Sequence, residues 1–257
     1  MESVIGLLTF IAIALGALTG LWLARHLPET HLSSESRTAV SVSMAVVGTL
    51  AALVMGLLIS SASSSFNAKT DALHRLAVDI IRLDRALRQY GPGAEGVRDL
   101  LLSYAQTKAE ELSDDGDPSS LDLRSLTKFE ALTSRVLDLQ PGDNHQRQAQ
   151  AQALKVLDSI ADARWLLIEK VNTSLPTSFV LLLIFWLALL FGSFGLFAPG
   201  NATVIIVLLL CALAISGGVF MVLELETATK GLVRVSTDPI FNAIREITSS
   251  QQALDRD

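Results

Sequence analysis

Charged residues are missing from four long windows of this chain, and their absence decides its class. The windows lie at 4–24, 39–59, 179–197 and 203–223, and none contains Asp, Glu, Lys, Arg or His. Roughly twenty apolar residues cross a hydrocarbon core of about 30 Å as a helix. We therefore expect membrane helices at 4–24, 39–61, 178–197 and 203–223, in an all-α, polytopic membrane protein.

Cysteine and basic residues are also scarce, which excludes further classes. Cys211 is the only cysteine and lies in the fourth apolar window, so no intrachain disulfide is possible. A net charge of −6 and the lack of a basic stripe exclude a nucleic-acid partner. The flank Met1-Glu2-Ser3 lacks the positive charge of a signal peptide, which predicts that the first apolar window is retained.

The sequence has none of the motifs of common enzymes or cofactor-binding proteins. It lacks a Gly-rich phosphate loop, HExxH and paired CxxC motifs, so we expect neither an enzyme nor a bound cofactor. His26, Glu29 and His31 resemble a metal-binding set only in composition. They lie in a loop with Pro28 and no fourth donor, which favours a polar interfacial loop, and no metal site is expected.

The windows group into two hairpins separated by about a hundred polar residues. The expected divisions are a membrane hairpin at 1–65, a helical bundle at 66–174, a second hairpin at 175–224 and a tail at 225–257. Four stretches of the middle segment have the spacing of three and four that marks one apolar helix face. Helices of this kind pack as a bundle.

The second membrane helix is expected to continue into the bundle. No Gly or Pro lies between Gly56 and Gly91, and the apolar spacing of the first bundle helix extends back through Phe66 to Ile59. The fourth bundle helix is expected to run toward the third membrane helix, with a kink at Pro176.

Basic residues near the membrane ends predict the orientation. The side with the termini and bundle has eight, and the other side has only Arg25 and Arg37. The positive-inside rule then predicts cytoplasmic N- and C-termini in a bacterial inner membrane. The eight are Lys69, Arg75, Arg82, Arg85, Arg164, Lys170, Lys230 and Arg234.

Small residues form a stripe along the second membrane helix, at a spacing of four. One interpretation is close helix packing in lipid, as for a shorter ladder of Ala12, Gly16 and Gly20 in the first helix. The other is a pore whose neck offers hydroxyls without fixed charge, which would tolerate anions. The candidates for packing or pore lining are Gly48, Ala52, Gly56, Ser60, Ser61 and Ser64.

Two further groups are candidates for a role in permeation. Aromatic side chains could form a gate, although aromatics near a helix end more often form an interfacial belt. The gate candidates are Phe66, Phe191, Phe194 and Phe197. Glu224 and Glu226 follow the fourth membrane helix and are candidates for a charged cluster at the mouth, or simply mark the water boundary.

Arg164 is expected to form a structural ion pair. It occupies an apolar position of the fourth bundle helix, and a buried Arg requires a partner. Asp84 is the preferred partner and Asp79 the second, while the alternative is that Arg164 reaches solvent.

Several short motifs together resemble a family of bacterial membrane proteins of unknown function that is grouped as bestrophin-like. They are Leu27-Pro28-Glu29, Leu53-Val54-Met55-Gly56, Leu83-Asp84-Arg85, Tyr90-Gly91-Pro92 with Arg98, Arg164-Trp165-Leu166-Leu167, and Leu223-Glu224-Leu225-Glu226. Bestrophins are pentameric anion channels with cytosolic termini and a pore lined by the second membrane helix. The resemblance implies the same architecture here.

The leading hypothesis is an oligomeric bestrophin-like channel that passes small anions through a pore lined by the second membrane helix. Its expected partners are the lipid bilayer, further copies of the chain in a homo-oligomer such as a pentamer, and small inorganic anions. The alternative is a non-conducting scaffold or sensor, in which the bundle binds a partner or a signal.

Overall fold

The computed structural model describes residues 2–113, 118–172, 177–226 and 235–254. Its described elements are all helical: α1 Glu2–His26, η1 Glu29–Leu32, α2 Ser34–Tyr90, η2 Pro92–Ala94, α3 Glu95–Ser113, α4 Pro118–Leu137, α5 Asn144–Asn172, α6 Thr177–Phe197, α7 Ala202–Glu226 and α8 Asp238–Leu254. The all-α fold class is therefore confirmed.

The chain divides into two compact units, each with its own apolar core. The first, called the membrane unit, comprises Met1–Ser65 and Ser174–Thr227. The second, called the bundle unit, comprises Phe66–Thr173 and Ala228–Asp257. Helix α2 contributes residues to both, because it runs without interruption for 57 residues. The continuous helix predicted from the lack of Gly and Pro is thus confirmed.

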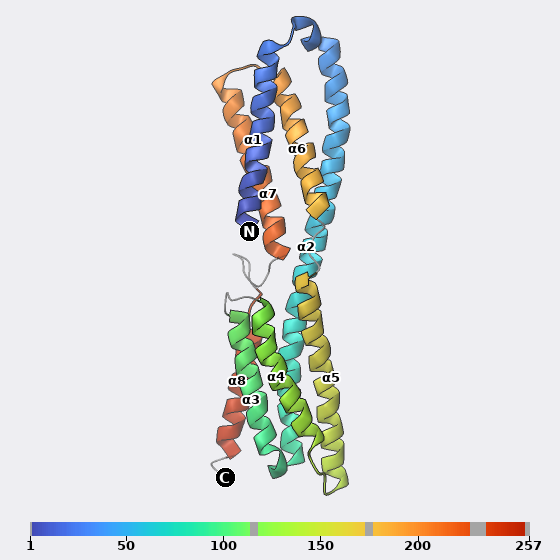
Figure 1. The fold of residues 1–257 in the computed structure, drawn as a ribbon, viewed down its shortest axis with the longest axis vertical. Coiled ribbons are helices and arrows are strands. Elements are labelled where there is room, and N and C mark those ends of the chain that lie inside the picture. The colour runs from blue at the N-terminus through green and yellow to red at the C-terminus, as the bar shows by residue number, and fades with distance from the viewer. Residues whose placement is uncertain (1, 114–117, 173–176, 227–234, 255–257) are drawn as a thin grey trace. The chain divides into compact units, whose positions relative to one another are not determined.

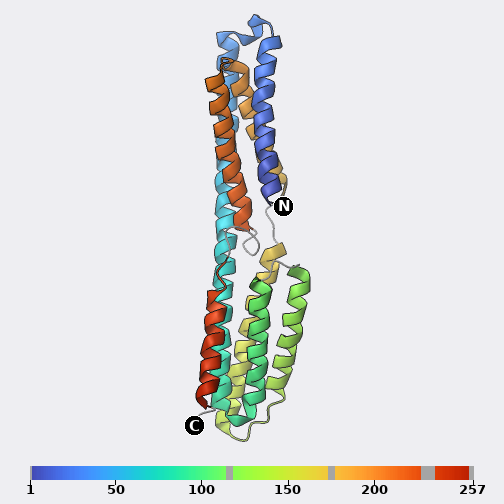
Figure 2. The same ribbon diagram turned by 90° about the vertical axis from the view of Figure 1, so that its left-hand side faces the viewer.

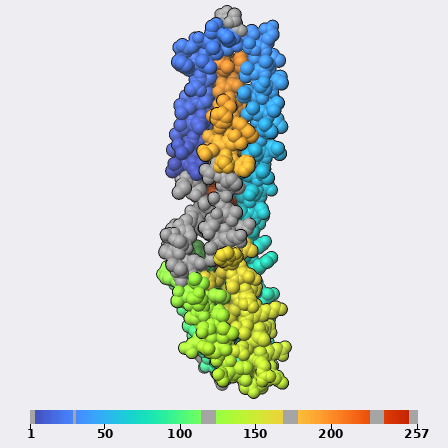
Figure 3. All heavy atoms as spheres, turned by 45° about the vertical axis from the view of Figure 1, so that its right-hand side comes forward, coloured from blue at the N-terminus to red at the C-terminus, as the bar shows by residue number. Residues whose placement is uncertain are grey.

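Four helices of the membrane unit are long and apolar enough to cross a bilayer. These spans are Val4–His26, the N-terminal part of α2, Ser178–Phe197 and Ala202–Leu225. Within this unit α1 packs most closely against α6 and α7, and α6 lies between α1 and α2 (Figures 1 and 3). The four apolar helices expected from the charge-free windows are confirmed.

The bundle unit is built on the apolar face of α2 that the sequence periodicity indicates. Leu76, Ile80, Leu83 and Leu87 are each 0–1% exposed in its core. Helix α2 ends at Tyr90, and the next residue, Gly91, has a φ of +97°, a conformation that favours glycine. The chain then turns through η2 and runs back as α3 (Figure 2).

Helix α8 is a component of the bundle unit that the sequence prediction left in the tail. Ile240, Ala243 and Ile247 are fully buried in the bundle core, so α8 joins α2, α3, α4 and α5 there (Figure 2). The predicted kink at Pro176, and the basic residues Lys230 and Arg234, lie outside the described residues.

Candidate functional site

The small-residue stripe of α2 is largely uncovered within the protomer. Five of its residues are exposed, although α2 is one of the helices of the membrane unit. They are Ala52, Gly56, Ser60, Ser61 and Ser64. A Cβ built on Gly56 would meet nothing within 4 Å. This stretch of α2 therefore does not use its small residues to pack within its own subunit.

Gly48, at the upper end of the stripe, is half-buried and differs from the rest. A Cβ built on it would lie 3.0 Å from Cδ1 of Leu190 on α6. The contact is with the end of a flexible side chain rather than with backbone, so α2 and α6 do not interlock here as closely as α1 and α6 do.

The shorter ladder of α1, in contrast, is a close-packing surface. A Cβ on Gly16 would overlap the carbonyl of Ala188, and one on Gly20 would overlap the carbonyl of Gly192. Gly195 of α6 meets α1 in the same way, since its Cβ would overlap the carbonyl of Ala17. Similar sequence patterns therefore have different roles: the α1 ladder joins two helices of one subunit, whereas the α2 stripe is left open.

The serines at the lower end of the stripe are also distinctive in their hydrogen bonding. Thr38, Ser43 and Thr49, earlier on α2, each donate to the carbonyl four residues before, over 2.8–2.9 Å. Among the described residues, no such bond is formed by Ser60 or Ser64. The hydroxyls of Ser60 and Ser64 are therefore available to water or to a polar partner, which an unsatisfied hydroxyl favours over hydrocarbon.

The exposed side of α2 changes character along its length. Val42, Val46, Leu53 and Leu57 are 60–70% exposed, which gives the upper part an apolar surface. Below them the exposed side chains are hydroxyls, of Ser60, Ser61, Ser63 and Ser64. The exposed surface of α2 is thus mainly apolar up to Ile59 and carries neutral hydroxyl groups after it.

The four gate candidates occupy different environments. Phe191 is only 3% exposed and lies in the core of the membrane unit, where its ring meets that of Phe194 edge-on at 5.8 Å. A side chain buried inside the protomer cannot line a conduit, so Phe191 is removed from the candidates. Phe194 is 47% exposed, and Phe66 and Phe197 are half-buried.

The charged mouth is described only in part. Glu224 is 4% exposed at the end of α7, so burial rather than simple solvation characterises this carboxylate. The side chain of Glu226 lies outside the described residues. No group of three His, Cys, Asp or Glu that could hold a metal ion occurs among the residues that the structure describes.

The predicted ion pair between Asp84 and Arg164 is wrong, because Asp84 has other partners. Asp84 instead binds Arg98 on α3 over 2.8 Å and Arg88 on α2 over 3.0 Å. Arg164 is buried as predicted, at 4% exposure, but its guanidinium lies over the ring of Phe129, 4.9 Å from the centroid. Periodicity predicted that Arg164 lies on the buried face of α5. Its contact with Phe129 could not be predicted in this way, because it depends on how α4 and α5 pack.

Asp79, the second candidate for Arg164, also has other partners. It accepts a hydrogen bond from Ser159 on α5 over 2.6 Å and pairs with Arg82 over 3.2 Å. The sequence analysis did not predict that Arg98 pairs with Asp84. The one indication was that Arg98 belongs to the motifs that resemble the bestrophin-like family.

A family model described as a bestrophin-like domain matches residues 11–240. No curated protein matches the chain.

Solved structures match nearly the whole chain. Two variants of a bacterial bestrophin homologue from Klebsiella pneumoniae each give a TM-score of 0.71 at 14% identity, covering 96% and 95% of this chain and 98% and 97% of theirs. A variant described as a membrane protein gives 0.67 at 13% identity, covering 94% of this chain and 96% of its own. The structures establish a shared fold, and the family model extends over most of the sequence. This chain belongs to the bestrophin-like family.

Proposed function

We propose that this chain forms a homo-oligomeric anion channel, pentameric like the bestrophins it resembles, with α2 lining the conduit. The observation that carries the proposal is the uncovered serine segment of α2, with Ser60 and Ser64 exposed and without hydrogen bonds among the described residues. A ring of subunits around α2 would place these hydroxyls in water. Isolated in lipid, they would be costly.

The chemistry of this segment suits weak anion binding. Hydroxyl groups donate hydrogen bonds to an anion without the fixed charge that would hold it too tightly to leave. The charge-free window of α2 supplies no carboxylate that would repel an anion within the membrane. Membership of the bestrophin-like family also suggests anion conduction rather than enzymatic activity.

The proposal also includes candidate residues for constrictions and for the mouth of the conduit. Phe66, on α2 just beyond the serines, and Phe194 and Phe197, on α6, remain candidates for constrictions. Glu224 and Glu226 remain candidates for the mouth of the conduit. The termini are assigned to the cytoplasm, and the protein to a bacterial inner membrane, from the excess of basic residues on that side.

Reconstitution into liposomes tests the proposal. Chloride efflux should be measured from vesicles with the wild-type chain and with Ser60→Trp, which would place a large ring in the neck. The control is Leu210→Trp, on an exposed position of α7 outside the α2 stripe. We expect most of the flux to be lost in Ser60→Trp and retained in Leu210→Trp.

Two results would contradict the proposal. Equal flux in both variants would remove Ser60 from the conduit. A folded, oligomeric wild-type protein without flux would favour the scaffold or sensor. That alternative has its own support, because α2 is one helix shared by the membrane and bundle units and could transmit a signal between them.

A further inference from the structure

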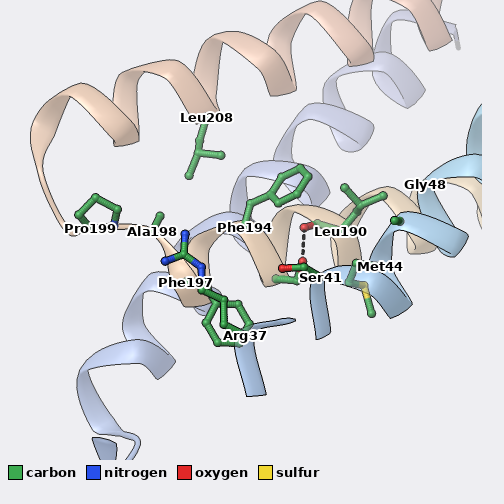
Figure 4. A pocket seen from close by; sticks show the side chains of 12 residues that line it. Arg37, Ser41, Met44, Gly48, Leu190, Phe194, Phe197, Ala198, Pro199 and Leu208 are labelled. Atoms are coloured by element: carbon green, nitrogen blue, oxygen red, sulfur yellow. Dashed lines mark hydrogen bonds between the residues drawn. The ribbon is translucent and has the colours of Figure 1, made fainter. Parts of the chain in front are cut away.

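A groove opens on the membrane unit where the first turns of α2 pass the end of α6 and the start of α7 (Figure 4). Its volume is about 530 Å³, within the range of small-molecule sites. It is separate from the serine segment, which lies further along α2. The lining from α2 is Arg37, Ser41, Met44, Ala45 and Gly48, and the remainder includes Leu190, Phe194, Phe197 and Leu208.

The groove has a polar end and an apolar end. Arg37 and Ser41 lie near the start of α2, and Met44 and Gly48 lie one to two turns further along the same helix (Figure 4). The twelve residues from Arg37 to Gly48 extend about 16 Å along the helix axis, because each of the eleven steps between them rises about 1.5 Å. One leaflet of a bilayer has a hydrocarbon depth of about 15 Å, so the groove matches the length of a lipid chain.

The apolar end offers no free hydrogen-bonding group from Ser193. Its hydroxyl donates to the carbonyl of Leu190 over 3.0 Å, as the dashed line in Figure 4 marks. The rest of this end is formed by Leu190, Phe194 and Leu208. Such a wall suits hydrocarbon rather than water or a polar ligand.

The polar end of the groove carries the positive charge of Arg37. Among the described residues, the guanidinium of Arg37 forms no hydrogen bond or ion pair. Arg25 does not line the groove, but its Nη2 would lie 3.7 Å from a Cβ on Gly200, the residue after Pro199 of the groove wall. Arg37 is therefore the guanidinium that a phosphate in the groove would meet first, and Arg25 is a second cation near the same loop.

We propose that this groove binds an anionic phospholipid of the leaflet nearest the α1–α2 loop. The phosphate pairs with Arg37, with Arg25 beside it, and one acyl chain lies along Met44 and Gly48 of α2. A second copy of the chain is the alternative occupant, since the exposed Glu35 of its α2 start could pair with Arg37, and the crosslinking experiment below separates the two. The proposal concerns lipid recognition and does not depend on conduction.

Photo-crosslinking of the full chain distinguishes the occupants. p-Benzoylphenylalanine should replace Met44, and the protein should be reconstituted in vesicles of equal phosphatidylglycerol and phosphatidylcholine. We expect lipid adducts, identified by mass, that favour phosphatidylglycerol about tenfold, as one charge-assisted contact implies. The same crosslinker at Leu210, an exposed α7 position outside the groove lining, should show no headgroup preference.

Arg37→Gln in the Met44 crosslinker background tests the role of the cation. The preference for phosphatidylglycerol should fall to near unity, whereas Arg147→Gln, on an exposed position of α5, should keep it. A covalent dimer in place of lipid adducts would overturn the proposal in favour of a second copy. A phosphatidylglycerol preference unchanged by Arg37→Gln would also overturn it. Gel filtration of each variant checks that the fold is retained.

Discussion

Arg98 donates a hydrogen bond from Nε to Oδ1 of Asp84 over 2.8 Å, with both side chains almost completely buried. Nε of Arg88 lies 3.0 Å from the other carboxylate oxygen. The hydroxyl of Ser250 on α8 accepts a bond from Nη2 of Arg98 over 3.2 Å. One buried carboxylate thus connects α2, α3 and α8.

Removal of Arg98 should destabilise the bundle unit. Arg98→Met leaves the buried carboxylate of Asp84 with the partly exposed Arg88 and a 3.4 Å hydrogen bond from the Ser250 hydroxyl, and breaking a buried pair costs about 3 kcal/mol. Urea denaturation of the detergent-solubilised protein, followed by circular dichroism, measures the loss. Arg147→Met, at an exposed position, should cost less than about 0.5 kcal/mol. Equal midpoints for the two variants would show that Arg88 and Ser250 are enough to compensate the Asp84 carboxylate.

Alanine at Gly20 should disrupt the membrane unit, whereas alanine at Gly56 should not disrupt the protomer. Alanine is favoured over glycine in a helix by about 1 kcal/mol, but at Gly20 its Cβ would overlap the carbonyl of Gly192. We expect Gly20→Ala to lower the thermal midpoint in detergent, measured by the loss of the gel-filtration peak after heating. If Gly20→Ala proved as stable as Gly56→Ala, the close packing of α1 on α6 would be wrong.

Helix α8 should detach when its buried face is charged. Ile247 is fully buried, so Ile247→Asp places a carboxylate in the bundle core, whereas Phe241→Asp changes a position that is 44% exposed. Limited trypsin digestion should cleave after Arg245 faster in Ile247→Asp than in the wild type or Phe241→Asp. Identical cleavage rates in all three would argue against α8 as a stable part of the core.

The single cysteine makes the predicted topology easy to test. In a Cys211→Ala background, Asp143→Cys marks the bundle unit and Glu35→Cys marks the start of α2, both at exposed positions. A membrane-impermeant maleimide applied to intact spheroplasts should label Glu35→Cys and not Asp143→Cys. The reverse pattern would place the bundle outside and favour the sensor.

The proposed assembly predicts a defined mass. Mass photometry of the purified protein should give five chains of 27.6 kDa above the mass of the detergent or nanodisc. Gly56→Trp places a large ring on the small-residue stripe of α2 and should shift the mass distribution toward smaller species. A wild-type dimer would favour face-to-face packing of the stripes and would remove the axial conduit.

Much of the fold could be predicted because it depends on local patterns. Twenty uncharged residues require a helix in lipid, since every backbone group must be satisfied within the segment. The unbroken run from Gly56 to Gly91 likewise predicted one long α2. Ile240 and Ile247 carry the same kind of local pattern, but they lie in a stretch that sequence reasoning left as a tail.

Local sequence patterns were enough to predict which helix faces are apolar and where most helices end. Which of these faces pack against each other depends on the three-dimensional arrangement of the helices. It separated the ladder of Gly16 and Gly20, which is packed, from the stripe of Gly56 and Ser60, which is open, and it gave Asp84 to Arg98 rather than to Arg164. This difference arises because periodicity reports burial along one helix, whereas the partner of a buried side chain depends on residues that are distant in the chain.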